Sequence, residues 1–540
     1  MDALRDNPAR KFSEVEMKFF KMWWDEQNDT KKALVHKLIA NGQLELINAG
    51  WSMHDEACPT YEDMINNHII GHQWILDEFG VKPRIGWQID PFGHSNTNAR
   101  IFAEMGFDAW FFARLDYGDK EKRMNDQEME FVWRPNAESL GTDTQILTHA
   151  LYAHYSSPSG LNFDVLDSDS PWINNEKSKD FNGDTEGKMF ADYLTTKAEH
   201  YLTDEIFVLF GDDFRYMDAF QNYINMDRMI EYMNKHYGDQ FFLKYSTPSE
   251  YVDAIAAINV TWPVKYDDMF PYADNPDSYW TGYFSSRAND KQQVRRASSN
   301  YHSSNQLIAE KCLDQSKDAE DLQDELVEGS WALLDDLSIL QHHDAVSGTA
   351  KQAVADDYAW RLFTGMKKNN EGYFKMIDER IRSMTGIANQ TWVECFRTNS
   401  TYVDCPVSNY EDQKNYVMNV AVQNPSTIDM NQATFAVPNG KYDVKVYCTK
   451  AKKFVSVNAS VSCWDDYAEN NVTYKACNIK ISHTTKARDF SLFELTQNDA
   501  AELSITNGTV QEGSEIKSKM TNSNLSTKAQ SKTHPKLTSD

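Results

Sequence analysis

The sequence predicts an α/β portion, then a helical segment, then a β-rich segment. Three observations predict this order. Strand-like apolar runs alternate with helical patterns up to about residue 264. Residues 288–384 contain three long helical patterns rich in Gln, Lys, Ala and Asp. After Gly386, short alternating runs such as 415–422 and 441–447 are separated by Asn, Pro, Ser and Gly, which is typical of β-strands and turns.

The α/β portion begins with an amphipathic helix over residues 29–40 and a strand over 43–48. A βαβ unit follows, in which 84–89 suits a strand, 96–105 a helix and 107–112 a second strand.

Farther along, residues 205–210 form a nearly continuous apolar run. We expect such a run to be a strand that is covered on both faces.

Polar residues follow three of the predicted strands, 84–89, 107–112 and 205–210. Asp90 ends the first strand and is held in a turn by Pro91 and Gly93, and Arg114 follows the second. Carboxyl ends of parallel strands are where α/β folds bind ligands and catalyse reactions, so these positions indicate a site. The alternative for Asp90 is a plain helix cap.

Asp212 and Asp213 follow the third predicted strand as adjacent carboxylates. Mutual repulsion and partial burial would raise the pKa of one of them, which suits a general acid such as a glycosidase requires. A helix N-cap with an acidic neighbour is the structural alternative.

A His-His-Asp sequence, His342 to Asp344, comes directly after an amphipathic pattern over residues 331–340. Histidine pairs at a helix end bring no packing advantage but are able to ligate metals. By itself this pair identifies no metal, and a structural role is the alternative.

Taken together, these motifs resemble glycoside hydrolase family 38, the retaining α-mannosidases, and most closely the lysosomal acid type. The resemblance runs from about Phe12 to about Leu495 and rests on several segments in the same order: residues 50–56, 87–95, 111–116, 211–216, 266–274, 279–287 and 341–349.

The resemblance implies a fold, a reaction and a cofactor. The fold is an incomplete α/β barrel with a mainly parallel sheet, followed by a three-helix domain and a β-sandwich-like domain. The reaction is the hydrolysis of terminal α-linked mannose from N-glycans by double displacement, with Asp90 as nucleophile and Asp213 as acid/base. Zn²⁺ would be bound by Asp90 and His343.

The resemblance also implies a set of residues that contact the sugar. Phe92 and Trp280 would pack against the ring, Arg114 would face the nucleophile, and Asp212 would stand beside the acid/base. Three further carboxylates would accept hydrogen bonds from sugar hydroxyls: Asp164, Asp274 and Asp344.

One departure from the family pattern concerns the metal. Members carry a His-x-Asp pair near the start of the catalytic domain that supplies two more zinc ligands, and the 89 residues before Asp90 contain no such pair. We therefore expect a chain truncated at its N-terminus. Because family members continue into a long β-rich region that this sequence lacks, we also expect truncation at its C-terminus. The alternative function is an inactive mannosidase-like glycoprotein that binds carbohydrate at most.

Composition narrows the class of protein and the expected partners. A net charge of −27 over 540 residues argues against nucleic acid or anionic membranes as partners, and no apolar run is long enough to span a membrane. The resemblance implies a mannose-containing oligosaccharide as substrate and is compatible with a homo-oligomer.

Cysteines and glycosylation sequons indicate a luminal or secreted protein. Five of the seven cysteines lie between Cys395 and Cys477, which predicts disulfides in the C-terminal portion, whereas Cys58 and Cys312 stand apart. Eight Asn-x-Ser/Thr sequons are present, at Asn28, Asn259, Asn389, Asn399, Asn458, Asn471, Asn507 and Asn524. The resemblance implies the lysosome, although residues 1–16 do not read as a signal peptide.

These patterns together predict four parts. Residues 1–287 form the α/β catalytic domain without its first element, 288–385 the three-helix domain, 386–505 the β-rich domain, and 506–540 a disordered tail.

Overall fold

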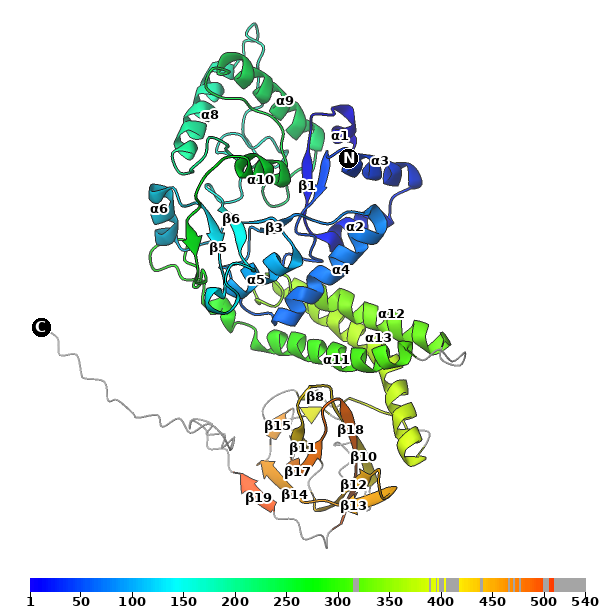
Figure 1. The fold of residues 1–540 in the computed structure, drawn as a ribbon. Helices are drawn as coiled ribbons and strands as arrows, with labels where there is room; N and C mark the ends of the chain where they lie inside the picture. The colour runs from blue at the N-terminus through cyan, green and yellow to red at the C-terminus, as the bar shows by residue number, and fades with distance from the viewer. Residues whose placement is uncertain are drawn as a thin grey trace, which may run out of the picture. The chain divides into compact units, whose positions relative to one another are not determined.

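The computed structural model describes two compact units, residues 1–376 and 377–540 (Figure 1). The residues that it describes are 1–313, 320–387, 390–394, 396–397, 403–404, 417–437, 440–464, 467–469, 472–474, 477–498 and 505–508. Within them, no helix carries a stretch long and apolar enough to cross a membrane.

The first unit begins with helices around a pair of short parallel strands, β1 and β2. Helix α3 has the predicted bounds because the Asn28 side chain accepts the backbone N–H of Lys31 at its start. The elements of this segment are α1 (Asp2–Asp6), β1 (Phe12–Glu14), α2 (Met17–Asp25), α3 (Asp29–Ala40), β2 (Leu44–Leu46) and α4 (Tyr61–Phe79).

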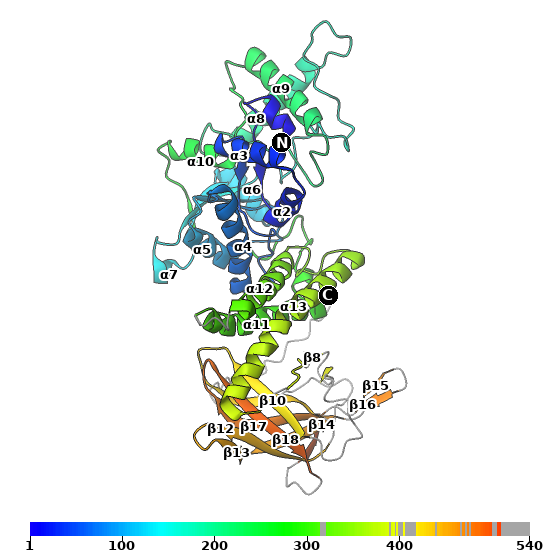
Figure 2. The ribbon, with the colours of Figure 1, turned by 90° about the vertical axis from the view of Figure 1, so that its right-hand side faces the viewer.

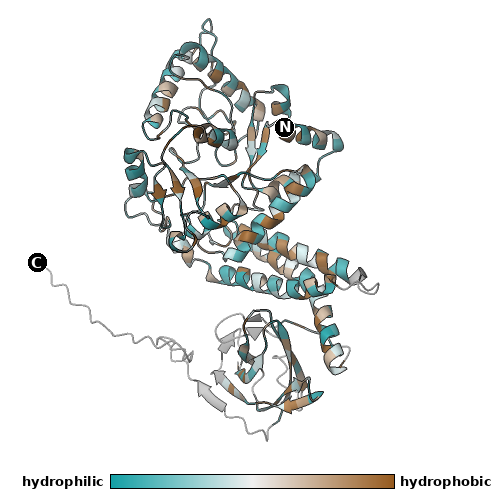
Figure 3. Ribbon diagram, viewed as in Figure 1, coloured by the Kyte–Doolittle hydropathy of each residue, from teal (hydrophilic) through white to brown (hydrophobic). Residues whose placement is uncertain are grey.

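A five-stranded sheet forms the centre of the first unit, in the order β3-β4-β6-β5-β7. Strands β3, β4 and β6 are parallel, and β5 runs antiparallel to β6. All residues of β3 and β4 are buried, as expected for strands covered on both faces, and brown segments are visible in this sheet in Figure 3. The strands are β3 (Ile85–Gln88), β4 (Ala109–Phe112), β5 (Glu130–Trp133), β6 (Ile146–Ala150) and β7 (Val264–Lys265).

Helix α5 (Asn96–Met105), which connects β3 to β4, confirms the predicted βαβ unit. Its first turn is capped by the Ser95 side chain, which accepts the N–H of Thr97, and Gly106 ends it in the left-handed region at φ 86°. The other helices of this portion are α6 (Tyr117–Asp126), α7 (Ala137–Leu140), α8 (Gly183–Ala198), α9 (Ala219–His236), α10 (Pro248–Ala256) and the 3₁₀ helix η1 (Gly282–Phe284).

The prediction of a strand over residues 205–210 is wrong. The segment belongs to no sheet of the described residues. Side chains satisfy several of its backbone carbonyls instead: Lys197 donates to Phe207 O, and Tyr216 donates to Phe210 O at 2.7 Å. The apolar run is therefore explained by its place on a cavity wall rather than by pairing with a neighbouring strand.

Three helices follow the α/β portion as predicted: α11 (Ala288–Cys312), α12 (Glu320–Ile339) and α13 (Gln352–Thr385). Figures 1 and 2 both show them side by side, with α12 next to α4. The Asp335 carboxylate on α12 accepts hydrogen bonds from Trp51 Nε1 at 2.6 Å and from Lys18 Nζ at 2.7 Å. This polar contact fixes the helical segment against the α/β portion.

The second unit consists mainly of two four-stranded sheets, in the orders β10-β18-β12-β13 and β11-β17-β14-β19. Side chains of both sheets share one apolar core, which includes Val444, Phe493, Ile479 and Ile481. The predicted sandwich-like arrangement is thus present. Its strands are β10 (Val417–Asn424), β11 (Met430–Val437), β12 (Tyr442–Cys448), β13 (Lys453–Ser456), β14 (Ala459–Trp464), β17 (Cys477–Thr485), β18 (Asp489–Gln497) and β19 (Ile505–Gly508).

Four shorter strands form two small ribbons, β8 (Phe396–Arg397) with β9 (Val403–Asp404), and β15 (Tyr467–Glu469) with β16 (Val472–Tyr474). Strand β19 extends past residue 506, where the disordered tail was predicted to begin, and the rest of that tail lies outside the described residues.

The cysteines agree in part with the prediction. Cys477 is in a disulfide, whereas Cys58, Cys312 and Cys448 are free thiols. Cys395, Cys405 and the Cys463 side chain lie outside the described residues.

Replacing Asp335 by Ala should destabilise the first unit by about 1–3 kcal/mol, because the buried Trp51 N–H loses its acceptor. Urea unfolding followed by Trp fluorescence measures this change. The control is Asp25→Ala, which removes an exposed ion pair with Lys21 and should cost about 0.5 kcal/mol or less. Equal losses in the two variants would contradict the assigned role of Asp335.

Candidate active site

The turn after β3 places Asp90 and is held from several directions. The Glu56 carboxylate, fully buried, contacts His94 Nδ1 at 2.9 Å and accepts the backbone N–H of Ser95 at 2.7 Å. Gly93 has φ +102°, and a Cβ there would lie 2.6 Å from the Phe270 ring, so no larger residue fits. The position of Asp90 is therefore set by buried contacts on both sides of the turn.

Both carboxylate oxygens of Asp90 are bound by cationic or polar groups. Oδ1 accepts from the Arg114 guanidinium, with Nε at 2.7 Å, and from the Tyr155 hydroxyl at 3.2 Å. Oδ2 lies 2.8 Å from His343 Nε2. Burial alone would raise the pKa of Asp90, but His343 and Arg114 outweigh burial and lower that pKa, so the carboxylate is ionised.

His343 is buried between Asp90 and the backbone of Met53. Its Nδ1 lies 2.8 Å from Met53 O, and its Nε2 faces Asp90. Burial lowers the pKa of the imidazole, but the Asp90 carboxylate more than compensates and raises the pKa of His343 to about 9. Both ring nitrogens then donate hydrogen bonds.

Asp213 is an exposed carboxylate in a strained turn. Its backbone N–H donates to Asp212 Oδ1 at 2.8 Å, and Phe214 and Tyr216 have φ 57° and 62°. Partial burial raises the pKa of Asp213, and the negative charges of Asp90 and Asp212 raise it further. Asp213 is thus more readily protonated than Asp90.

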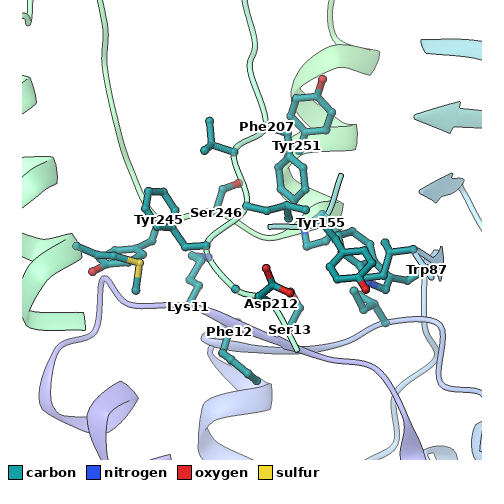
Figure 4. Close-up of a pocket in the computed structure, with 18 of the residues that line it drawn as sticks. Lys11, Phe12, Ser13, Trp87, Tyr155, Phe207, Asp212, Tyr245, Ser246 and Tyr251 are labelled. Carbon is teal, nitrogen blue, oxygen red and sulfur yellow. The ribbon is translucent and has the colours of Figure 1, made fainter. Parts of the chain in front are cut away.

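A cavity of about 1050 Å³ brings these groups together. Asp90, Asp212, Asp213, His343 and Asp344 all lie on its wall. Figure 4 shows Asp212 between Phe12 and Ser13 on one side and Phe207 on another. The cavity also extends along β1 and the extended segment 205–210, well beyond the two carboxylates.

Aromatic rings surround Arg114. The rings of Phe92 and Trp280 are 4.9 Å apart, and the guanidinium lies 5.5 Å and 5.0 Å from their centres. Trp280 Nε1 donates to Asp274 Oδ1 at 3.2 Å, which fixes the indole. These four predicted residues form one group beside Asp90, because Arg114 contacts both the carboxylate and the rings.

Residues 1–275 match the profile of the glycosyl hydrolases family 38 N-terminal domain, and residues 278–379 match that of the alpha mannosidase middle domain. The first match alone covers more than half of the chain. The chain belongs to glycosyl hydrolase family 38.

Curated relatives include the lysosomal alpha-mannosidase of Dictyostelium discoideum, 45% identical over 362 residues, which are 66% of this chain and 35% of that protein. The lysosomal alpha-mannosidase of Cavia porcellus is 40% identical over 369 residues, 68% of this chain and 36% of that one. The chain thus spans about a third of the length of these relatives.

Among solved structures, an alpha-mannosidase from Enterococcus faecalis V583 has a TM-score of 0.60 and 12% identity, covering 94% of this chain and 53% of that chain. At this level of identity, the structural similarity is evidence for a shared fold.

Asp164, predicted to accept a hydrogen bond from a sugar hydroxyl, lies beside the turn that carries Asp213. Its carboxylate is buried and accepts the backbone N–H groups of Leu166 at 3.3 Å and Tyr216 at 2.6 Å. The residue is not part of the wall of the large cavity as the structure describes it. In this structure it anchors the turn that carries Asp213.

Two residues on the cavity wall were missed from the sequence, Tyr155 and Glu16. Each follows a strand, β6 and β1 respectively, so the rule that drew attention to Asp90 applies to them as well. Neither strand was predicted, which is why neither residue was considered.

The donors at Asp90 fit a metal ion in part. His343 uses Nδ1 to bind a backbone carbonyl and presents Nε2, the usual arrangement of a metal-ligating histidine. His342, His343 and Asp344 also offer ligand atoms within 4.8 Å of one another. A catalytic zinc ion normally has three protein ligands, and Asp90 with His343 supplies two that face each other.

The raised pKa of His343 predicts a pH dependence of stability in metal-free protein. Because the folded-state pKa of about 9 exceeds the ordinary value of 6.5, the imidazolium–carboxylate pair stabilises fully below pH 6.5 and is lost as pH rises through about 9. We expect the free energy of unfolding to fall by no more than about 3 kcal/mol over that interval.

Urea titrations across this pH range in the presence of a chelator measure the effect. In His343→Gln the decline should be smaller than in wild type. The same slope in both proteins would contradict the assignment of the titrating group.

Proposed function

We propose that this chain carries the catalytic residues of a retaining, zinc-dependent exo-α-mannosidase that removes terminal α-linked mannose from N-glycans and glycoprotein oligosaccharides. The proposal is supported above all by two carboxylates in one cavity whose pKa values are moved in opposite directions, Asp90 down and Asp213 up. Family membership and the printed names of the relatives agree with it.

In the proposed reaction Asp90 attacks the anomeric carbon, and Asp213 protonates the leaving glycosidic oxygen. Asp213, now a carboxylate, then removes a proton from a water molecule as the water oxygen attacks the anomeric carbon. The bond between that carbon and Asp90 breaks, which frees the sugar and restores both carboxyl groups. Arg114 and Tyr155 hold Oδ1 of Asp90 and orient the nucleophile, and His343 and Arg114 keep it ionised.

The remaining residues would bind the sugar. Phe92 and Trp280 provide apolar surface for the pyranose ring, and Asp212, Asp274 and Asp344 are carboxylates available to its hydroxyls. Asp90 and His343 would hold the zinc ion, which would polarise sugar hydroxyls and restrain the ring.

The printed names of the relatives also support a lysosomal location. The proposed domains are residues 1–287, 288–385 and 386–505.

A second candidate function is carbohydrate binding without hydrolysis. The number of metal ligands favours this candidate. Asp90 and His343 supply two ligands, whereas a catalytic zinc ion usually has three protein ligands.

Release of nitrophenol from a chromogenic α-mannoside at acidic pH, with and without added Zn²⁺, separates the two candidates. We expect turnover that Asp90→Asn lowers by at least about 10³-fold, since the nucleophile is lost. A fluorinated mannoside that accumulates the covalent intermediate should label Asp90, as read by peptide mass spectrometry. Binding of mannose without turnover or labelling would support the second candidate.

Asp213→Ala distinguishes an acid/base from a residue that only contacts substrate. Substrates with poor leaving groups should lose most activity, while aryl mannosides with a good leaving group should retain fast formation of the covalent intermediate, because they need no proton. Pre-steady-state kinetics measures that step. Equal losses for both kinds of substrate would contradict the acid/base role.

The pH profile should respond to Asp212. Because the Asp212 charge helps to raise the pKa of Asp213, Asp212→Asn should move the alkaline limb of kcat/KM to lower pH. Asp218→Asn, in an exposed cap of α9, is the matched control and should leave the profile unchanged. An unmoved limb in Asp212→Asn would argue against Asp213 as the titrating acid.

A further inference from the structure

Glu16 is a partly buried carboxylate between β1 and α2, with its side chain 24% exposed. It lies on the wall of the cavity that contains Asp90 and His343. Its Oε1 accepts the backbone N–H of Met53 at 2.8 Å and is 4.0 Å from His342 Nε2. The proposed mechanism gives it no role.

Met53 is the residue that holds His343. The Met53 carbonyl accepts two hydrogen bonds, from the His343 backbone N–H at 3.1 Å and from His343 Nδ1 at 2.8 Å. The neighbouring backbone continues this pairing, because Asp55 N–H donates to Gln341 O at 2.8 Å. The orientation of the His343 ring therefore depends on where the Met53 backbone lies.

The contacts form one continuous path: Glu16 binds the Met53 N–H, Met53 O binds His343 Nδ1, and His343 Nε2 faces Asp90. We propose that Glu16 is a positioning residue, which fixes Met53 and thereby aims the His343 imidazole at the Asp90 carboxylate. This inference rests on the proposed function, since it assigns Asp90 and His343 the catalytic and metal-binding roles.

The contact acts through hydrogen-bond geometry. Met53 is 6% exposed, so removing its acceptor leaves a backbone N–H with little access to water. A residue that orients a metal-ligating histidine typically changes metal affinity about 10–100-fold when it is lost. Glutamine retains the carbonyl oxygen that accepts from Met53 and removes only the charge.

The test compares Glu16→Ala, Glu16→Gln and the exposed control Glu26→Ala. In Glu16→Ala we expect Zn²⁺ affinity, measured by competition with a chromophoric chelator, to fall about 10-fold or more. The kcat for an α-mannoside should fall by a similar factor with little change in KM. Glu16→Gln should restore both values to within about threefold, and Glu26→Ala should match wild type.

Two results would overturn the proposal: wild-type Zn²⁺ affinity in Glu16→Ala, or a Glu16→Gln variant as impaired as Glu16→Ala. The second would indicate that the charge itself contacts metal or sugar. If wild type hydrolyses no mannoside, the proposed function fails, while the metal titration still tests Glu16.

A double-mutant cycle in metal-free protein provides a readout independent of zinc and activity. If Glu16 acts through His343, the stability losses of Glu16→Ala and His343→Gln should combine to less than their sum in urea unfolding. Additive losses would contradict the path through Met53.

Discussion

The contact between Asp90 and His343 is the interaction on which the site depends. The two residues are 253 positions apart, one after β3 and the other after α12, and their side chains meet at 2.8 Å. Helix α12 lies against α4, and the contacts of Trp51 and Lys18 with Asp335 hold α12 to the α/β portion. The α/β portion and the three helices thus build one site, and neither provides it alone.

The same contact creates the electrostatic asymmetry of the cavity. His343 and Arg114 contact Asp90 and stabilise its negative charge, which lowers its pKa. Asp213 has the carboxylates of Asp90 and Asp212 as neighbours, and their negative charges raise its pKa. One wall of a single cavity therefore holds a carboxylate that stays ionised and another that takes up a proton more readily. Two chemically identical side chains thus acquire pKa values shifted in opposite directions by their neighbours.

Much of the predicted structure was confirmed because its signals are local. Helices α3 and α5 have the predicted bounds, since Asn28 and Ser95 cap their first turns and Gly106 ends α5 in a conformation that suits glycine. Residues 205–210 show the limit of this reasoning. An apolar run is compatible with a strand or with a cavity wall, and only the presence of a hydrogen-bonding neighbour distinguishes them.

The sequence by itself determined the order of the elements, the family resemblance and the residue types available for chemistry, including the Asp90 turn and the His342–His343 pair. The tertiary structure decided which of these groups meet. It brought His343 into contact with Asp90, placed the Asp164 carboxylate against the backbone of the Asp213 turn and connected Glu16 to His343 through Met53. Local patterns favour the φ, ψ and burial of many segments, but contacts between side chains hundreds of residues apart arise only when the whole chain packs.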